Sequence, residues 1–296
     1  MDSTLVKQFS VAKDISKAQD FYQKMINIID KVLSKIADKM SNITVDDIRI
    51  FAMGEYTNNT FIDETGELEI VVSNSNPQML LTNKTFKKQY AEAKNKKEKD
   101  KLSLKGTTHE LVDLFFKEII YYFGEETKLI LTGQGIKVLC KKEHDFNLMI
   151  RIGTFDQLDK EGTINFWNFI TKSEEKFKLF DYNEAIEKKD KKSKGNLKSL
   201  IRILKNLRKT MITNKWISPS EVNRYLVEYI AYNVPDKLLK GNDIVEVFAK
   251  SMLYLTNCSL NDYLDTDGEM LIYNRFANTD YAKIKKFLIN ANSILN

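Results

Sequence analysis

The stretch from Phe51 to Ser73, FAMGEYTNNTFIDETGELEIVVS, is the feature that most restricts the possible folds of this chain. It predicts a strand that ends near Met53, a turn at Gly54-Glu55 and a returning strand that begins at Glu67. Because side chains alternate between the two faces of a strand, Glu67 and Glu69 are expected to share one face of a sheet. Oxygen ligands of this kind suit a divalent cation, so the stretch predicts a place to hold a metal.

The composition indicates a folded globular protein. With 296 residues, 43% of them hydrophobic and 29% charged, the chain is long enough for two packed layers with a sizeable core. No apolar run reaches membrane-spanning length, and the N-terminus lacks the apolar centre of a signal peptide. We therefore expect a cytoplasmic protein that does not bind membranes.

Few residues are available for thiol or imidazole chemistry. Cys140 and Cys258 lie far apart without a CxxC partner, and the chain contains only two histidines, His109 and His144. This pattern argues against a disulfide framework, a thiolate zinc site and a catalytic triad. No GxxxxGK[ST] loop is present either. Metal or acid–base chemistry would rest mostly on carboxylates.

The formal charge of +5 is concentrated in two lysine-rich runs, residues 84–105 and 188–209. Each run fits a solvated helix face or loop, and each also fits a surface that binds anions such as nucleic acid. Aromatic residues are sparse within the runs, so stacking on single strands has little support. Both interpretations remain open at this point.

The order of expected elements predicts an α+β protein with two lobes. Apolar residues spaced by three and four predict a long helix over 15–40, and strands are expected around 45–54, 67–72, 129–140 and 146–155. A further helix is expected over 108–123. Helical patterns then dominate at 164–171, 197–210, 220–233, 243–255 and 280–295. We place a mixed sheet lobe at residues 1–162 and a helical lobe at residues 163–296.

This order resembles the nucleotidyltransferase superfamily, in the branch that holds oligoadenylate synthetases, cyclic GMP-AMP synthase and their bacterial relatives. In that family a Gly-Ser turn precedes an acidic-x-acidic strand, positions matched here by Gly54, Glu67 and Glu69. The segment KGNLKSLIRILKNLRK is similar to the family helix that carries a phosphate-contacting lysine, matched by Lys205. The resemblance covers nearly the whole chain, and the order of its motifs carries most of the weight.

The resemblance implies a chemistry and a set of site residues. In the family, three carboxylates bind two Mg²⁺ or Mn²⁺ ions, which neutralise a nucleoside triphosphate and activate an attacking hydroxyl. Here Glu67 and Glu69 would be the metal ligands and catalytic residues. The expected nucleotide- or phosphate-binding residues are Gly54, Glu55, Lys198, Arg202 and Lys205.

The chain departs from the family pattern at two places. Glu55 stands where the serine is expected, so an anion would face the triphosphate. No register of the strand over 146–155 supplies the third carboxylate, although Glu143 and Asp145 precede it. Arg151 on that strand is a candidate substitute for the metal, by pairing with Glu67 or Glu69.

These departures favour a nucleotidyltransferase-fold protein with a degraded metal site, which binds a nucleotide such as ATP or GTP, RNA or a protein partner with little or no catalysis. One alternative is an active, divergent enzyme that moves a nucleoside monophosphate from an NTP onto a hydroxyl, as in making a nucleotide second messenger or extending an RNA 3′ end. A second alternative is a basic nucleic-acid-binding module.

Overall fold

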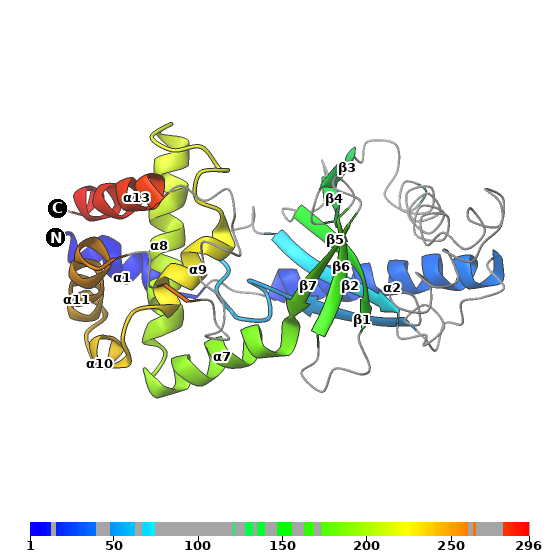
Figure 1. Cartoon of the computed structure of the whole chain (residues 1–296), viewed down its shortest axis with the longest axis horizontal. Coiled ribbons are helices and arrows are strands. Elements are labelled where there is room, and N and C mark those ends of the chain that lie inside the picture. Colours follow the sequence, from blue (N-terminus) through cyan, green and yellow to red (C-terminus); the bar gives the residue numbers. More distant parts are fainter. Residues whose placement is uncertain are drawn as a thin grey trace, which may run out of the picture. The chain divides into compact units, whose positions relative to one another are not determined.

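The computed structural model describes residues 1–12, 16–39, 48–62, 67–74, 121, 128–132, 135–139, 147–155, 163–168, 173–259, 263–264 and 281–295 (Figure 1). The chain forms two compact units, a helical unit and a sheet unit. The helical unit contains Met1–Asp14, Gly54–Asp63 and Phe180–Asn296. The sheet unit contains Ile15–Met53 and Glu64–Leu179. The segment that follows strand β1 therefore belongs to the helical unit.

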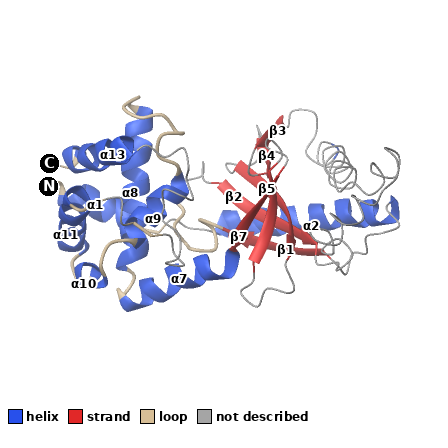
Figure 2. Cartoon of the chain, in the orientation of Figure 1, coloured by secondary structure: helices blue, strands red, loops and turns tan. Residues whose placement is uncertain are grey.

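The sheet unit is built on a seven-stranded mixed sheet, drawn in red in Figure 2. Its main path runs β1-β2-β5-β4-β3, and β6 continues from β5 to the edge strand β7. Among the described strands, β2 and β5 pair in parallel and the other pairs are antiparallel. The strands are β1 (Ile48–Met53), β2 (Glu67–Asn74), β3 (Lys128–Thr132), β4 (Gly135–Leu139), β5 (Asn147–Phe155), β6 (Thr163–Asn168) and β7 (Ser173–Lys178).

Strand β2 is an interior strand of this sheet and lies between β1 and β5. Its side chains from Leu68 to Val72 are all buried, as expected for a strand covered on both faces. Glu69 shares this burial, and its register partners are Met53 on β1 and Met149 on β5. A carboxylate in such a place is stable only with a charged or hydrogen-bonding partner.

The long helix predicted over 15–40 is confirmed as α2 (Ser16–Lys39). Phe21, Met25, Ile29 and Val32 recur at spacings of three and four and are buried. This is the face that amphipathic spacing predicts.

Helix α8 (Asn196–Thr213) is the centre of the helical unit. Its apolar residues, among them Leu200 and Leu204, are fully buried because helices α1, α9, α11 and α13 pack around it (Figure 1). The helices of the unit are α1 (Ser3–Ser10), α7 (Leu179–Lys192), α8, α9 (Arg224–Tyr232), α10 (Asp236–Leu239), α11 (Ile244–Asn257) and α13 (Tyr281–Ile294). Four of the predicted helical segments are thus confirmed, as α8, α9, α11 and α13.

Helix α9 begins later than the sequence predicts. We expected its start near Ser218-Pro219, but the helix begins at Arg224. The side chain of Asn223 accepts a hydrogen bond from the backbone N–H of Leu226 at 2.7 Å. This is an N-cap, which satisfies a donor that the first helical turn leaves without a partner.

The predicted helix over 164–171 is wrong, because Thr163–Asn168 forms strand β6. The segment is rich in β-branched and aromatic residues, and it pairs with β5 on one side and β7 on the other. Long-range pairing therefore overrides a short apolar pattern that fits both helix and strand. The strand signal continues to Lys178, well past the boundary we placed at residue 162.

Several predicted features lie outside the described residues. They are the lysine-rich run 84–105, the expected helix over 108–123 apart from Tyr121, and the positions of His109, Cys140, Glu143, His144 and Asp145. Within the described part of the chain, no helix is both long enough and apolar enough to span a membrane.

Gly135 provides a test of the sheet. Its φ is +147°, and a Cβ at this position would lie 2.3 Å from the backbone oxygen of Ile150 on β5. Gly135→Ala should lower the free energy of unfolding by about 3 kcal/mol, because backbone strain and a clash with backbone each cost about 1–3 kcal/mol. Denaturant titration measures this loss.

Gly195 is the matched control. Its φ is +86°, but a Cβ there would meet no atom within 4 Å. Gly195→Ala should therefore cost only the left-handed conformation, about 1 kcal/mol. Equal losses for the two variants would contradict the described packing of β4 against β5.

Candidate functional site

The acidic strand is one candidate site, and it lies in the sheet unit. Glu67 begins β2 and Glu69 follows two positions later, opposite Asn147 and Met149 of β5. The Nε of Arg151 donates a hydrogen bond to the Oε2 of Glu69 at 2.9 Å. Both side chains are buried, with exposed fractions of 7% for Arg151 and 3% for Glu69. The predicted contact between Arg151 and the acidic strand is present, and a role as metal substitute stays a prediction.

The described residues do not complete the three-carboxylate metal centre that the resemblance implies. No group of three His, Cys, Asp or Glu side chains suited to a metal occurs among them. The neighbour of Glu69 across the parallel pair is Met149, and the carboxylate of Glu69 is paired with a guanidinium. We therefore derive no step through a metal ion, and the Mg²⁺ or Mn²⁺ requirement stays a prediction.

The glycine turn is a separate candidate site, and it lies in the helical unit. Gly54 has a φ of +73°, in the left-handed region that glycine adopts at little cost. Its carbonyl oxygen accepts hydrogen bonds from the N–H of Asn58 at 3.0 Å and from the hydroxyl of Thr57 at 3.0 Å. The N–H of Thr60 donates to the carbonyl of Glu55 at 3.0 Å. These bonds fold residues 54–60 into a closed turn.

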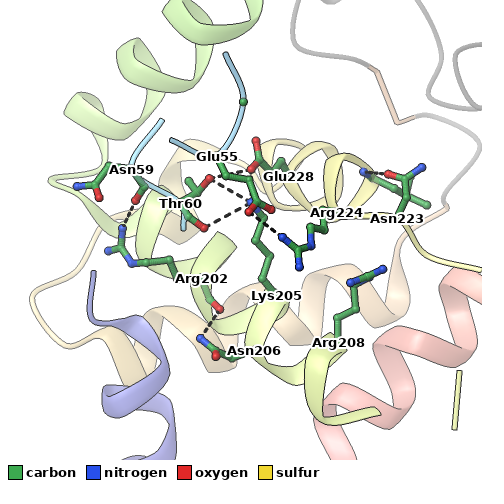
Figure 3. A network of polar contacts seen from close by, with 12 residues as sticks. Glu55, Asn59, Thr60, Arg202, Lys205, Asn206, Arg208, Asn223, Arg224 and Glu228 are labelled. Atoms are coloured by element: carbon green, nitrogen blue, oxygen red, sulfur yellow. Dashed lines mark hydrogen bonds and ion pairs between the residues drawn. The ribbon is translucent and has the colours of Figure 1, made fainter. Parts of the chain in front are cut away.

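Glu55 points from this turn into a group of cations (Figure 3). Its Oε1 lies 2.8 Å from the Nζ of Lys205 on α8, and its Oε2 lies 3.2 Å from the Nη1 of Arg224 on α9. Glu55 is 5% exposed and Lys205 is 1% exposed. Ion pairs held away from water in this way attract more strongly than surface pairs, although both groups lose hydration.

Glu228 on α9 is the second carboxylate around Lys205 (Figure 3). It is fully buried and forms an ion pair with Lys205. Its Oε1 also accepts a hydrogen bond from the Thr60 hydroxyl at 2.8 Å, and its Oε2 accepts one from the Tyr182 hydroxyl. One lysine charge thus connects the turn with helices α7, α8 and α9.

The predicted phosphate-binding residues on α8 have different roles in the structure. Lys205 contacts Glu55 and Thr60 of the turn, and its role in binding phosphate stays a prediction. Arg202 donates to the backbone oxygens of Asn59 at 2.9 Å and Ser10 at 2.7 Å, so it holds the turn and the N-terminal segment. Burial lowers the pKa of Arg202. Lys198 instead pairs with Glu187 on α7. The structure therefore brings Gly54, Glu55, Arg202 and Lys205 together and leaves Lys198 aside.

Arg208 adds a further buried cation beside this network. Its guanidinium donates to the backbone oxygens of Val222 and Pro219, the latter at 2.9 Å. Burial lowers the pKa of Arg208 to about 10, with a further decrease from nearby Arg224 and a partial opposing effect from Glu55. The positive charges of Arg208 and Arg224 therefore repel each other.

Sequence reasoning missed Arg224 and Glu228, which prove to be central to this network. A signal was present, because the helix RYLVEYIAY is apolar except for these two charges, placed four residues apart on one face. Charges within an otherwise apolar helix indicate a buried partner.

The sequence is similar to a known protein family and to a characterised enzyme. A family model described as the cGAS/DncV-like nucleotidyltransferase C-terminal helical domain matches residues 184–296. The cyclic dipyrimidine nucleotide synthase CdnE of Legionella pneumophila is 23% identical over 279 residues, which is 88% of each chain.

Two solved structures resemble the whole chain. The first is the CdnE cyclic dinucleotide synthase of Elizabethkingia meningoseptica with GTP and Apcpp, at a TM-score of 0.69 and 13% identity over 100% of this chain and 99% of that one. The second is the CdnE c-UMP-AMP synthase of Rhodothermus marinus with Apcpp and Upnpp. Its TM-score is 0.70 and its sequence identity is 15%, over 99% of this chain and 96% of that one.

The chain therefore has the nucleotidyltransferase fold, a mixed sheet unit with a C-terminal helical domain, as the sequence predicted. The helical part of the chain, residues 184–296, matches the C-terminal domain of cGAS/DncV-like nucleotidyltransferases, and the whole chain is similar to cyclic dinucleotide synthases. The resemblance stated from the sequence is thus confirmed for the fold and for the C-terminal domain.

Lys205 provides a test of the network. Lys205→Met removes the cation between Glu55 and Glu228 and leaves two buried carboxylates without their shared partner. The variant should lose about 3–5 kcal/mol of unfolding free energy, the usual cost of breaking a buried ion pair. Urea denaturation followed by circular dichroism measures the loss.

Lys198→Met is the matched control on the same helix. Lys198 pairs with Glu187, whose side chain is 45% exposed. Its loss should stay below about 1 kcal/mol, as for surface pairs. A loss for Lys205→Met as small as that of Lys198→Met would contradict a central role for the buried network.

Proposed function

We propose that this chain is a nucleotidyltransferase that moves a nucleoside monophosphate from an NTP onto a hydroxyl, in the manner of enzymes that make nucleotide second messengers. The single observation that carries the proposal is that the fold of cyclic dinucleotide synthases extends over the full chain, 100% and 99% of it in two cases. The similarity also extends over 99% and 96% of those two synthases.

The arrangement of the acidic strand supports the same proposal. Glu67 and Glu69 occupy an interior strand beside the parallel partner β5, and Gly54 follows β1 with the backbone conformation that a tight turn requires. In the proposed reaction, Glu69 is the catalytic carboxylate and Lys205 is the phosphate-binding cation. The relatives whose structures contain GTP, Apcpp or Upnpp favour a nucleoside triphosphate as the substrate class.

A specific observation favours a second candidate, a protein that binds a nucleotide without transferring it. Glu69 is paired with Arg151 at 2.9 Å, and Lys205 is held between Glu55 and Glu228. Each residue that the first candidate assigns to catalysis has an internal partner of opposite charge. Such partners lower the affinity for a metal or a phosphate, since the ligand must displace them.

Pyrophosphate release separates the two candidates. We expect purified protein, supplied with each labelled NTP and Mg²⁺ or Mn²⁺, to release pyrophosphate and form a nucleotide product. Glu69→Gln should reduce this release by at least about a hundredfold, because the carboxylate acts on the reacting groups. Thin-layer chromatography of the labelled product gives the readout.

Glu187→Gln is the matched control, since it neutralises a carboxylate that pairs on the outside of the helical unit. It should leave pyrophosphate release unchanged. A folded wild-type protein that binds an NTP but releases no pyrophosphate with either ion would contradict the first candidate and support the second.

Nucleic-acid binding by the run 188–209 stays a prediction with a narrower basis. Arg202, Lys205 and Arg208 of this run are buried and contact other groups of the chain. The exposed cations of the run are Lys188, Lys191, Lys192, Lys194 and Lys209.

If the exposed lysines bind RNA by neutralising phosphates, affinity should fall steeply as salt rises. Contacts with about four phosphates predict a slope of log K against log salt near −3. Fluorescence anisotropy with a labelled RNA between low and moderate salt measures the slope. A flat dependence would rule out this mode.

A further inference from the structure

Glu55 is held as if it were a bound anion. Its two carboxylate oxygens contact two different cations, Lys205 at 2.8 Å and Arg224 at 3.2 Å, from two different helices. Figure 3 shows the carboxylate between these side chains, at the end of the turn that carries it. A small oxyanion with two charged oxygens would make the same contacts.

If the charge of Glu55 were removed, the cations around it would favour the binding of another anion. Lys205 and Arg224 contact the carboxylate of Glu55, and Arg208 lies close enough to be affected by the charges of Glu55 and Arg224. Without Glu55, Lys205 and Arg224 would each lose a carboxylate contact. Buried like charges destabilise one another and favour any anion that can enter.

One of the two cations is partly exposed to solvent, and the turn contains a buried donor that has no partner in the described part of the chain. The side chain of Arg224 is 28% exposed, whereas those of Glu55 and Lys205 are 6% and 1% exposed. The turn also contains Asn58, whose Nδ2 is buried and has no hydrogen-bond partner among the described residues. A buried donor without a partner is unusual in a folded protein and suits a ligand with acceptor oxygens.

We propose that Glu55 is a tethered anion that competes with an external phosphate for Lys205 and Arg224. The turn keeps the carboxylate beside these cations, so an external anion must overcome a high local concentration of the internal one. Glu55 thereby sets the affinity of the site for oligophosphates. The identity of the natural anion, a nucleoside triphosphate, rests on the proposed function, whereas the competition itself does not.

Inorganic tripolyphosphate is the probe, used in low-salt buffer without nucleotide or divalent ion. The wild-type protein should bind it weakly by isothermal titration calorimetry. Glu55→Gln and Glu55→Ser should bind it at least about tenfold more tightly, because repulsion between two nearby anions is lost. The ligand should also raise the melting temperature of both variants by more than that of the wild type.

Two further variants locate the effect. Arg224→Gln combined with Glu55→Gln should abolish the gain, since it removes one of the two cations. Glu187→Gln, which removes a carboxylate from the pair with Lys198, should leave binding at the wild-type level. A wild type that binds tripolyphosphate as tightly as Glu55→Gln would overturn the proposal, as would absence of binding in both Glu55 variants.

A second measurement applies if the Glu55 variants are unstable. If the Glu55 variants unfold in low salt, phosphate should restore their circular dichroism spectrum, whereas chloride at equal ionic strength should not. Equal effects of the two salts would overturn the proposal. Because no NTP and no metal are present, a protein without transferase activity can still pass this test, and an active transferase can fail it.

Discussion

The ammonium group of Lys205 is the interaction on which the arrangement of the turn depends. It lies at the centre of the helical unit, with Glu55 on one side and Glu228 on the other. Removing such a charge from water costs several kcal/mol, and only closely placed partners offset that cost. The backbone of the turn, the length of Glu55 and the placement of α9 are therefore coupled. None of them can change much while the lysine remains charged and buried.

The sheet unit shows the same physical principle with other residues. Glu69 lies on an interior strand whose neighbouring side chains are apolar and buried, and Arg151 supplies the opposite charge at 2.9 Å. Each unit thus contains a buried carboxylate that is paired with a cationic side chain of the same unit. In both cases the paired residue is one for which the family resemblance implies contact with a metal or a phosphate. Internal charges and external ligands are consequently alternatives for the same groups.

The sequence was sufficient for the features that depend on local periodicity. Spacings of three and four residues predicted α2, α8, α11 and α13, because burial of one helix face leaves a regular pattern. The strand β6 was missed because TINFWN is short and its pairing with β5 and β7 is not encoded locally. Local patterns carry little information on which distant segments will pair.

The candidate site was predictable by residue type and only partly by partner. The spacing of Glu67 and Glu69 followed from strand alternation, and the contact of Arg151 with this strand followed from the same rule applied to β5. The contact between Glu55 and Lys205 joins positions that are 150 residues apart in the sequence. Neither periodicity nor composition reports such a contact. The charged residues Arg224 and Glu228 within an otherwise apolar helix were the available sign that α9 contributes to the network.

The fold and the chemistry of this protein respond differently to sequence change. An apolar core tolerates substitution as long as volume and pattern are kept, so a fold can persist at 13–15% identity. A charged site tolerates much less, because each added or lost charge must be matched by a neighbour. Glu55 illustrates the point: its negative charge in the turn is matched by Arg224 on α9 and shared with Lys205. Such matching keeps the protein stable at the site while it changes what the site can bind. The competition proposed for Glu55 is accordingly a property of these charge pairs, which related proteins can change while they keep the same fold.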